Sequence, residues 1–245
     1  MSTTAQRVFA WSGIVFANVF FIGMLLAGIL PPHSPLDNPS DVVNNWNDNV
    51  DLERLGIFLM MIAAGFTAPF GAVISVYLRK ISPDGGYSYL QLIGAATGVV
   101  AILVPTFMFA AEAFRPDRPA EIQQAINDLA WIPFVMNYPP ALMQTMAVGF
   151  ATLEQKGENP LFPRWFGYYN LWTGFLFLPG GLILWFKHGA FAWNGALAFW
   201  LVAVAFGAWF IVTCLILLRA IKRTAAEEAA AAAPAAAPAT ATASA

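Results

Sequence analysis

Six long apolar segments constrain what this chain can fold into. They cover residues 8–30, 55–78, 89–111, 129–153, 166–186 and 195–218, and none has an Asp, Glu, Lys or Arg in its interior. A helix needs about 20 apolar residues to cross the hydrocarbon core of a bilayer. The sequence therefore predicts an all-α fold, a polytopic integral membrane bundle of six transmembrane helices.

The composition supports a membrane location. Only 11% of the 245 residues are charged and the mean hydropathy is +0.63, whereas soluble proteins have about 25% charged residues. We therefore expect the lipid bilayer of the cell (plasma) membrane to cover much of the surface. The net charge of −2 argues against a nucleic-acid partner, since binding phosphates requires a basic patch. The first apolar run is longer than the about 7–15 residues of a secretory signal, so we interpret it as an uncleaved span.

Lysine and arginine predict the orientation, because they are enriched in cytoplasmic loops. With both termini in the cytoplasm (N-in/C-in), eight of these residues lie inside and four, Arg54, Arg115, Arg118 and Lys187, lie outside. The expected domains are a transmembrane domain over residues 1–223 and a cytoplasmic low-complexity tail over residues 224–245. The Ala/Pro-rich tail lacks large apolar residues, which predicts disorder, although the alanines before Pro234 could extend the last helix.

Prolines interrupt four of the six segments. A proline removes one backbone N–H and frees the carbonyl about four residues earlier, and that carbonyl must find another partner at membrane depth. The prolines predicted to share the outer half are Pro105, Pro139, Pro140 and Pro179. They indicate either a substrate cavity of the kind that broken helices build in transporters or ordinary kinks.

Small residues at helical spacing predict close helix packing. Gly94 and Gly98 form a GxxxG pattern, Ala64, Ala68 and Ala72 follow steps of four, and the last segment carries Ala203 and Gly207. Packing within the bundle and formation of a homo-oligomer are the two interpretations.

Polar side chains form two stripes inside apolar segments. Asn137 and Gln144 lie on one helical face of the fourth segment, and Asn170 and Thr173 on one face of the fifth. Amides are costly against lipid, so both stripes should face the bundle interior. They serve either as hydrogen bonds between helices or as the polar lining of a ligand-binding pocket.

A metal-binding site is a further candidate for a functional site. His33, His188 and Glu112 all fall at the predicted outer ends of helices, and imidazole with carboxylate is a common ligand set. However, no H-x-x-x-H or E-x-x-H spacing is present, so solvated side chains are the competing interpretation. Nearby, the spacing of Ile122, Ile126 and Leu129 predicts a short amphipathic helix on the outer membrane surface.

The chain lacks the common catalytic and nucleotide-binding motifs. It has no Walker A sequence, dinucleotide-binding fingerprint, G-x-S-x-G or C-x-x-C. We assign no catalytic residue and the sequence indicates no cofactor, which favours a role other than an enzyme without deciding it.

Five short sequence stretches carry a family resemblance. Residues 162–172 (FPRWFGYYNLW) with 178–182 (LPGGL) and 191–195 (FAWNG), and residues 114–118 (FRPDR) with 127–131 (NDLAW), resemble a group of uncharacterised multi-pass membrane proteins of actinobacteria. The resemblance covers about half of the chain. It implies a bacterial multi-pass membrane protein and no activity, cofactor or site residue.

Three functions fit these observations. The first is a membrane protein that binds or passes a small neutral or apolar ligand through an outer-half cavity. The second is a non-catalytic accessory or scaffold subunit of a larger membrane complex, held by other membrane subunits. The third is a membrane enzyme that uses His33, His188 and Glu112.

Overall fold

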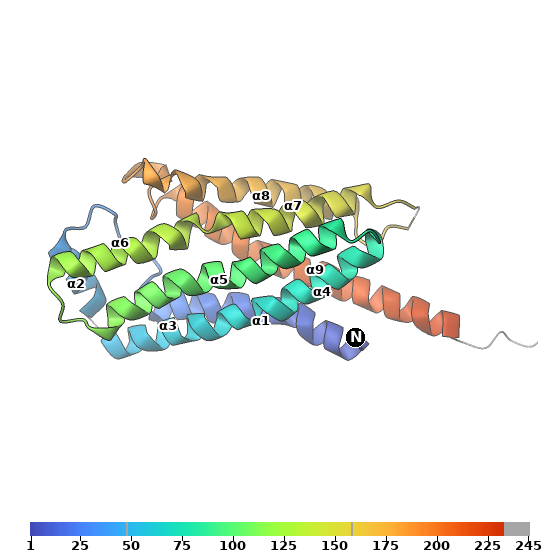
Figure 1. The fold of residues 1–245 in the computed structure, drawn as a ribbon, viewed down its shortest axis with the longest axis horizontal. Helices are drawn as coiled ribbons and strands as arrows, with labels where there is room; N and C mark the ends of the chain where they lie inside the picture. The colour runs from blue at the N-terminus through green and yellow to red at the C-terminus, as the bar shows by residue number, and fades with distance from the viewer. Residues whose placement is uncertain (48, 158, 233–245) are drawn as a thin grey trace, which may run out of the picture.

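In a computed structural model, the chain is an elongated bundle of helices (Figure 1). The structure describes residues 1–47, 49–157 and 159–232, and this part is 82% helical and contains no strand. The α-helices are α1 (Thr3–Leu26), α2 (Pro39–Asn47), α3 (Val50–Gly65), α4 (Thr67–Ile81), α5 (Gly86–Phe114), α6 (Ala120–Met136), α7 (Tyr138–Glu154), α8 (Arg164–Phe177) and α9 (Leu201–Ala232). Shorter turns are η1 (Leu178–Leu184), η2 (Gly189–Phe191) and η3 (Ala196–Trp200).

The prediction of an all-α protein is confirmed. Within the described residues, four helical stretches are long and apolar enough to cross a membrane: Thr3–Leu26, Val50–Ile81, Gly86–Phe114 and Gly189–Ala232. The fourth and fifth predicted spans differ from these. The fourth is divided into α6 and α7, each of 17 residues, and the fifth is a 14-residue helix followed by a 3-10 turn. Each piece alone is shorter than the about 20 residues that a span needs.

Helix ends differ from the predicted boundaries for local reasons. The first helix ends at Leu26 instead of residue 30, because Gly28 takes a left-handed conformation (φ 67°) and the Ile29 N–H bonds back to the Met24 carbonyl at 3.0 Å. The last helix continues to Ala232, so residues 224–232 of the predicted tail are helical. The rest of the predicted tail lies outside the described residues.

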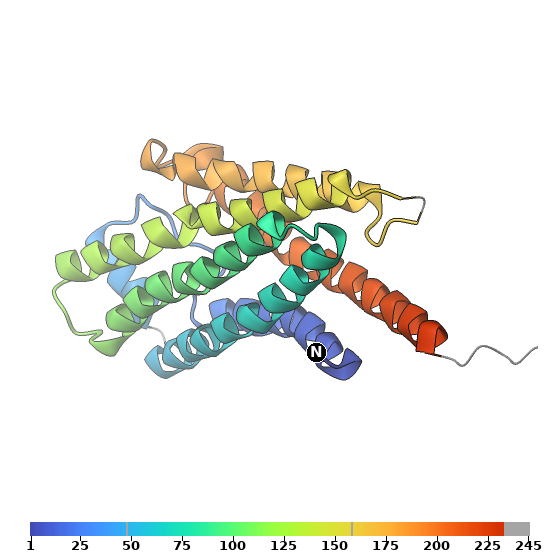
Figure 2. The ribbon, with the colours of Figure 1, turned by 45° about the vertical axis from the view of Figure 1, so that its right-hand side comes forward.

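The bundle has two ends. The N-terminus, the turn after α4, the loop after α7 and the end of α9 lie together, on the right in Figures 1 and 2, and we call this the N-end. Arg223 of α9 donates to the carbonyls of Asn159 and Pro160 at 3.0 Å, and Lys80 pairs with Glu228 at 3.4 Å. The opposite end, which we call the far end, holds α2, the α5–α6 loop and η2.

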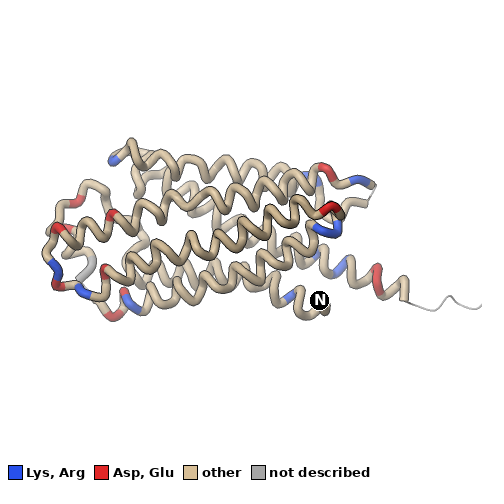
Figure 3. Tube along the Cα trace, in the orientation of Figure 1, with Lys and Arg blue, Asp and Glu red and all other residues tan. Residues whose placement is uncertain are grey.

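In the described part of the chain, the Asp, Glu, Lys and Arg residues gather at the two ends and leave the middle of the bundle without them (Figure 3). In the described chain the far end has eight Asp and Glu against four Lys and Arg, and the N-end has the reverse. The far-end acids are Asp37, Asp41, Asp51, Glu53, Glu112, Asp117, Glu121 and Asp128. The formal net charge is thus −4 at the far end and +4 at the N-end.

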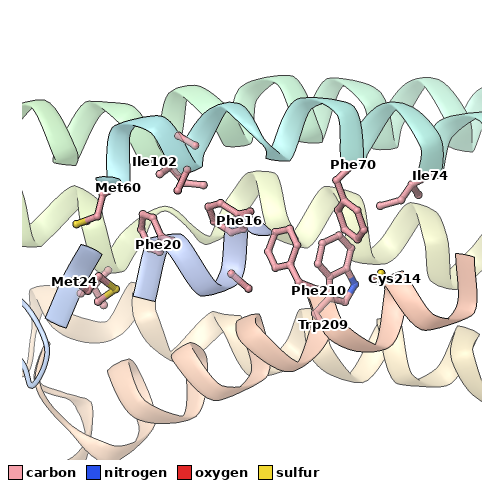
Figure 4. Close-up of a cluster of buried hydrophobic side chains, with 14 of the residues drawn as sticks. Phe16, Phe20, Met24, Met60, Phe70, Ile74, Ile102, Trp209, Phe210 and Cys214 are labelled. Carbon is pink, nitrogen blue, oxygen red and sulfur yellow. The ribbon is translucent and has the colours of Figure 1, made fainter. Parts of the chain in front are cut away.

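Aromatic residues fill the core between α1, α4 and α9 (Figure 4). The ring of Phe210 lies 4.6 Å from that of Phe16 and 5.2 Å from that of Phe70, measured between centroids. These contacts pack α1, α4 and α9 against one another. Phe70 and Phe210 also line one of the two interior cavities.

Candidate functional site

The break between α6 and α7 creates the central feature of the interior. Pro139 and Pro140 lie in the first turn of α7, the part of a helix that tolerates proline best because no backbone N–H is needed there. The chain therefore leaves helical geometry at Asn137 (φ −76°, ψ 21°) and α7 begins at Tyr138.

Two adjoining cavities lie at this break. The larger has a volume of about 80 Å³ and the smaller about 40 Å³. Both are lined by Ile102, Asn137, Ala141, Phe177 and Phe206. The larger is otherwise bounded mainly by aromatic and aliphatic side chains, including Phe20, Phe134 and Tyr138. It is thus an apolar chamber with an amide in its wall.

Asn137 also repairs the backbone of α5. Pro105 stays inside that helix, so it leaves the carbonyl of Ala101 without its helical N–H partner. The Nδ2 of Asn137 donates to this carbonyl at 3.3 Å. The side chain therefore has a structural role as well as a place in the cavity wall.

Gln144 lies about two helical turns beyond Asn137, in the lining of the smaller cavity. Its Oε1 accepts from Nε2 of buried Gln91 at 3.4 Å, and the Oε1 of Gln91 accepts from the hydroxyl of Ser75. The stripe predicted from Asn137 and Gln144 thus faces the interior, with both residues at the cavities.

Asn170 and Thr173 are buried, but neither is among the cavity-lining residues. Asn170 accepts from Nε1 of Trp209 at 2.8 Å and donates to the Phe166 carbonyl at 2.8 Å. Thr173 donates to the Tyr169 carbonyl at 2.8 Å. Their observed contacts are hydrogen bonds within α8 and from α8 to α9.

The three residues of the predicted metal site lie in different surroundings. His33 Nε2 is 3.1 Å from the Gly28 carbonyl oxygen, His188 is exposed before η2, and Glu112 is fully buried near the end of α5. Among the described residues no group of three or more His, Cys, Asp or Glu side chains could hold a metal ion. The structure therefore does not bring these three together.

Around Glu112 the structure assembles polar residues that the sequence interpretation missed. Glu53 of α3 is 5% exposed, and Gln123 and Asn127 of α6 are 1% and 5% exposed. The short amphipathic helix expected here is the first part of α6, in which Ile122 and Leu129 are exposed while Gln123 and Asn127 are buried. The spacing of Gln123 and Asn127, four residues apart, was the signal that could have revealed this face.

Comparisons of the chain with protein families, with curated proteins and with solved structures find no match.

Proposed function

We propose that the protein is a six-span, N-in/C-in membrane protein of the plasma membrane that binds a small neutral or apolar ligand at the α6–α7 break. The observation that carries the proposal is the pair of cavities that meet at Asn137. In this arrangement α6–α7 and α8–η1 complete the set of spans as interrupted helices, because each pair together is long enough to cross a bilayer.

The lining supports the ligand class. Neither cavity has a charged side chain in its lining, so an ionic ligand would lose its hydration without compensation. Asn137 and Tyr138 line the larger cavity, and in the proposed complex their side-chain oxygen atoms orient one polar group of the ligand. A ligand with an apolar body and a single hydroxyl or carbonyl fits this pattern.

The volumes support a small ligand. The two cavities together approach the about 150 Å³ of an engineered apolar cavity that binds benzene or xenon. A short alkanol or a single aromatic ring matches this space, whereas a whole lipid does not.

Photolabelling tests the proposal on the purified protein in nanodiscs. The probe is a short-chain alkanol that carries a diazirine, and labelled peptides are identified by mass spectrometry. We expect saturable labelling at Tyr138 or its neighbours, which an excess of the unlabelled alkanol abolishes. Labelling of lipid-facing residues should not saturate.

Two cavity-filling substitutions and one matched control sharpen the test. Ala141→Phe fills the space where both cavities meet and should abolish the saturable labelling, with Ala203→Phe as a second cavity-filling variant. Ala96→Phe adds the same ring on the exposed face of α5 and should leave it unchanged. Non-saturable labelling of the unaltered protein would contradict the proposal. So would saturable labelling of both cavity variants at the level of the unaltered protein.

The role of an accessory subunit gains no support from the glycine stripe. A Cβ on Gly94 would lie 2.8 Å from Cγ of Gln144 and 3.0 Å from the Pro140 carbonyl oxygen. This face of α5 is therefore packed against α7 in the same chain, and it is not available to a partner at that position.

A further inference from the structure

Three buried hydrogen-bond acceptors at the far end have no donor. The side chain of Glu112 is 0% exposed and Gln123 is 1% exposed. Both carboxyl oxygens of Glu112 and the Oε1 of Gln123 have no hydrogen-bond partner in the described part of the chain. Buried polar atoms almost always have partners, and an unpaired buried carboxylate is especially costly. A bound cation or a proton on the carboxyl group would relieve this cost, and the two have different experimental consequences.

The nearby side-chain donors bind backbone carbonyls at the C-terminal end of α5 instead of the Glu112 carboxylate. The last carbonyls of a helix have no partners within it, and here three successive ones are bonded from outside. Arg118 donates to Ala111 at 2.6 Å, Gln123 Nε2 donates to Glu112 at 3.2 Å, and Arg54 Nε donates to Ala113 at 3.2 Å. The Gln123 amide therefore lies directly beside Glu112, and neither guanidinium forms a salt bridge with the Glu112 carboxylate.

Electrostatics at this place favour a positive charge. The negative charges of Glu53 and Asp128 act on Glu112, and the guanidinium of Arg118 acts against them. The C-terminus of α5 adds a partial negative charge. The whole far end has a formal net charge of −4 among its described residues. A cation is therefore attracted to this end of the bundle.

We propose that Glu112 and Gln123, with Glu53 supplying a second negative charge, form a binding site for a divalent cation of the calcium type. Carboxylate and amide oxygens are the ligands of hard cations, and Ca²⁺ accepts irregular sets of such oxygens more readily than Mg²⁺. Two carboxylates match its charge. This donor set differs from the His33, His188 and Glu112 combination, because it uses amide oxygen in place of imidazole.

The test measures stability of the full chain in detergent after removal of divalent ions with EGTA. Cys214 is the single cysteine and is buried, so a thiol-reactive fluorophore reports its exposure on unfolding. We expect CaCl₂ to raise the melting temperature by about 5–10 °C at a hundredfold excess over the dissociation constant. Equilibrium dialysis with radioactive calcium should give one ion per chain.

Variants connect the effect to the site. Glu112→Gln should abolish the calcium-dependent shift, and in EGTA it should melt above the unaltered protein because no buried carboxylate is left unpaired. Gln123→Leu should weaken calcium binding, and it serves as the second variant if Glu112→Gln does not purify. Glu121→Gln removes an exposed carboxylate at the same end and should retain the shift.

Three outcomes would overturn the proposal. One is no calcium-dependent shift in the unaltered protein, and another is an unchanged shift in both site variants. The third is an EGTA-treated protein that gains stability on acidification and none from CaCl₂, which would mean that the carboxyl group is protonated instead.

Discussion

Asn137 illustrates how one residue can serve the fold and the candidate site together. It lies where two helices meet, at the wall of both cavities, and its amide nitrogen bonds to the carbonyl that Pro105 leaves free. Among the described residues, no hydrogen bond to the amide oxygen of Asn137 is observed. The donor half of the side chain therefore stabilises α5, and the proposed function assigns the acceptor half to the ligand.

A double-mutant cycle tests the structural half of this assignment. Asn137→Leu removes the donor and should destabilise the protein by about 1 kcal/mol, since hydrogen bonds between membrane helices contribute roughly that amount. In the Pro105→Ala background, residue 105 regains an N–H for the Ala101 carbonyl, so the same substitution should cost much less. The measurement is unfolding in denaturant for all four proteins. Equal losses in both backgrounds would show that the 3.3 Å contact is not what Asn137 contributes.

At the level of elements, apolar segments predicted helices well and predicted their ends poorly. The second predicted segment begins at residue 55, directly after the ionisable residues Glu53 and Arg54, whereas α3 begins at Val50. The helix continues through these residues because Arg54 caps α5 and Glu53 turns inward. A search for uncharged segments therefore leaves out Glu53, which with Glu112 forms the carboxylate pair of the proposed cation site. Such a pair is visible only once α3 and α5 are placed side by side.

The helix pair α1 and α3 was also hidden from the sequence. A Cβ on Gly23 would lie 2.7 Å from the carbonyl oxygen of Gly56, and a Cβ on Gly56 would meet the carbonyl of Gly23 in return. The two glycines are on different helices, so no spacing pattern along the chain reveals them. Their contact sets how closely the two backbones approach.

Substitution of these glycines tests this packing. Gly56→Ala should destabilise the protein by about 1–3 kcal/mol, because the added methyl group would collide with backbone, which cannot move aside as a flexible side chain can. Gly65→Ala is the matched control on the same helix, since nothing lies within 4 Å of its Cβ position, and it should be neutral or slightly stabilising. Melting temperatures of the two variants provide the comparison, and similar values for both would argue against the close approach.

For the whole molecule, the distribution of charge is the strongest guide to orientation. The N-end has a formal net charge of +4 and the far end −4 among the described residues. Positive residues near the ends of spans stay in the cytoplasm, so this difference predicts a cytoplasmic N-end. It also predicts that the proposed cation site lies on the opposite side of the membrane, whereas the α6–α7 break lies between two helices of 17 residues each.

Cysteine labelling in intact cells tests this orientation directly. In a Cys214→Ser background, Ser40→Cys introduces a thiol on exposed α2 at the far end, and Ala229→Cys introduces one on exposed α9 at the N-end. A membrane-impermeant maleimide should modify position 40 in intact cells and position 229 only after permeabilisation. The two sites control for each other, because both are exposed helical positions of similar size. Modification of position 229 alone in intact cells would reverse the orientation and place the carboxylate pair on the cytoplasmic side, whereas modification of both would contradict the separation of the two ends by the membrane.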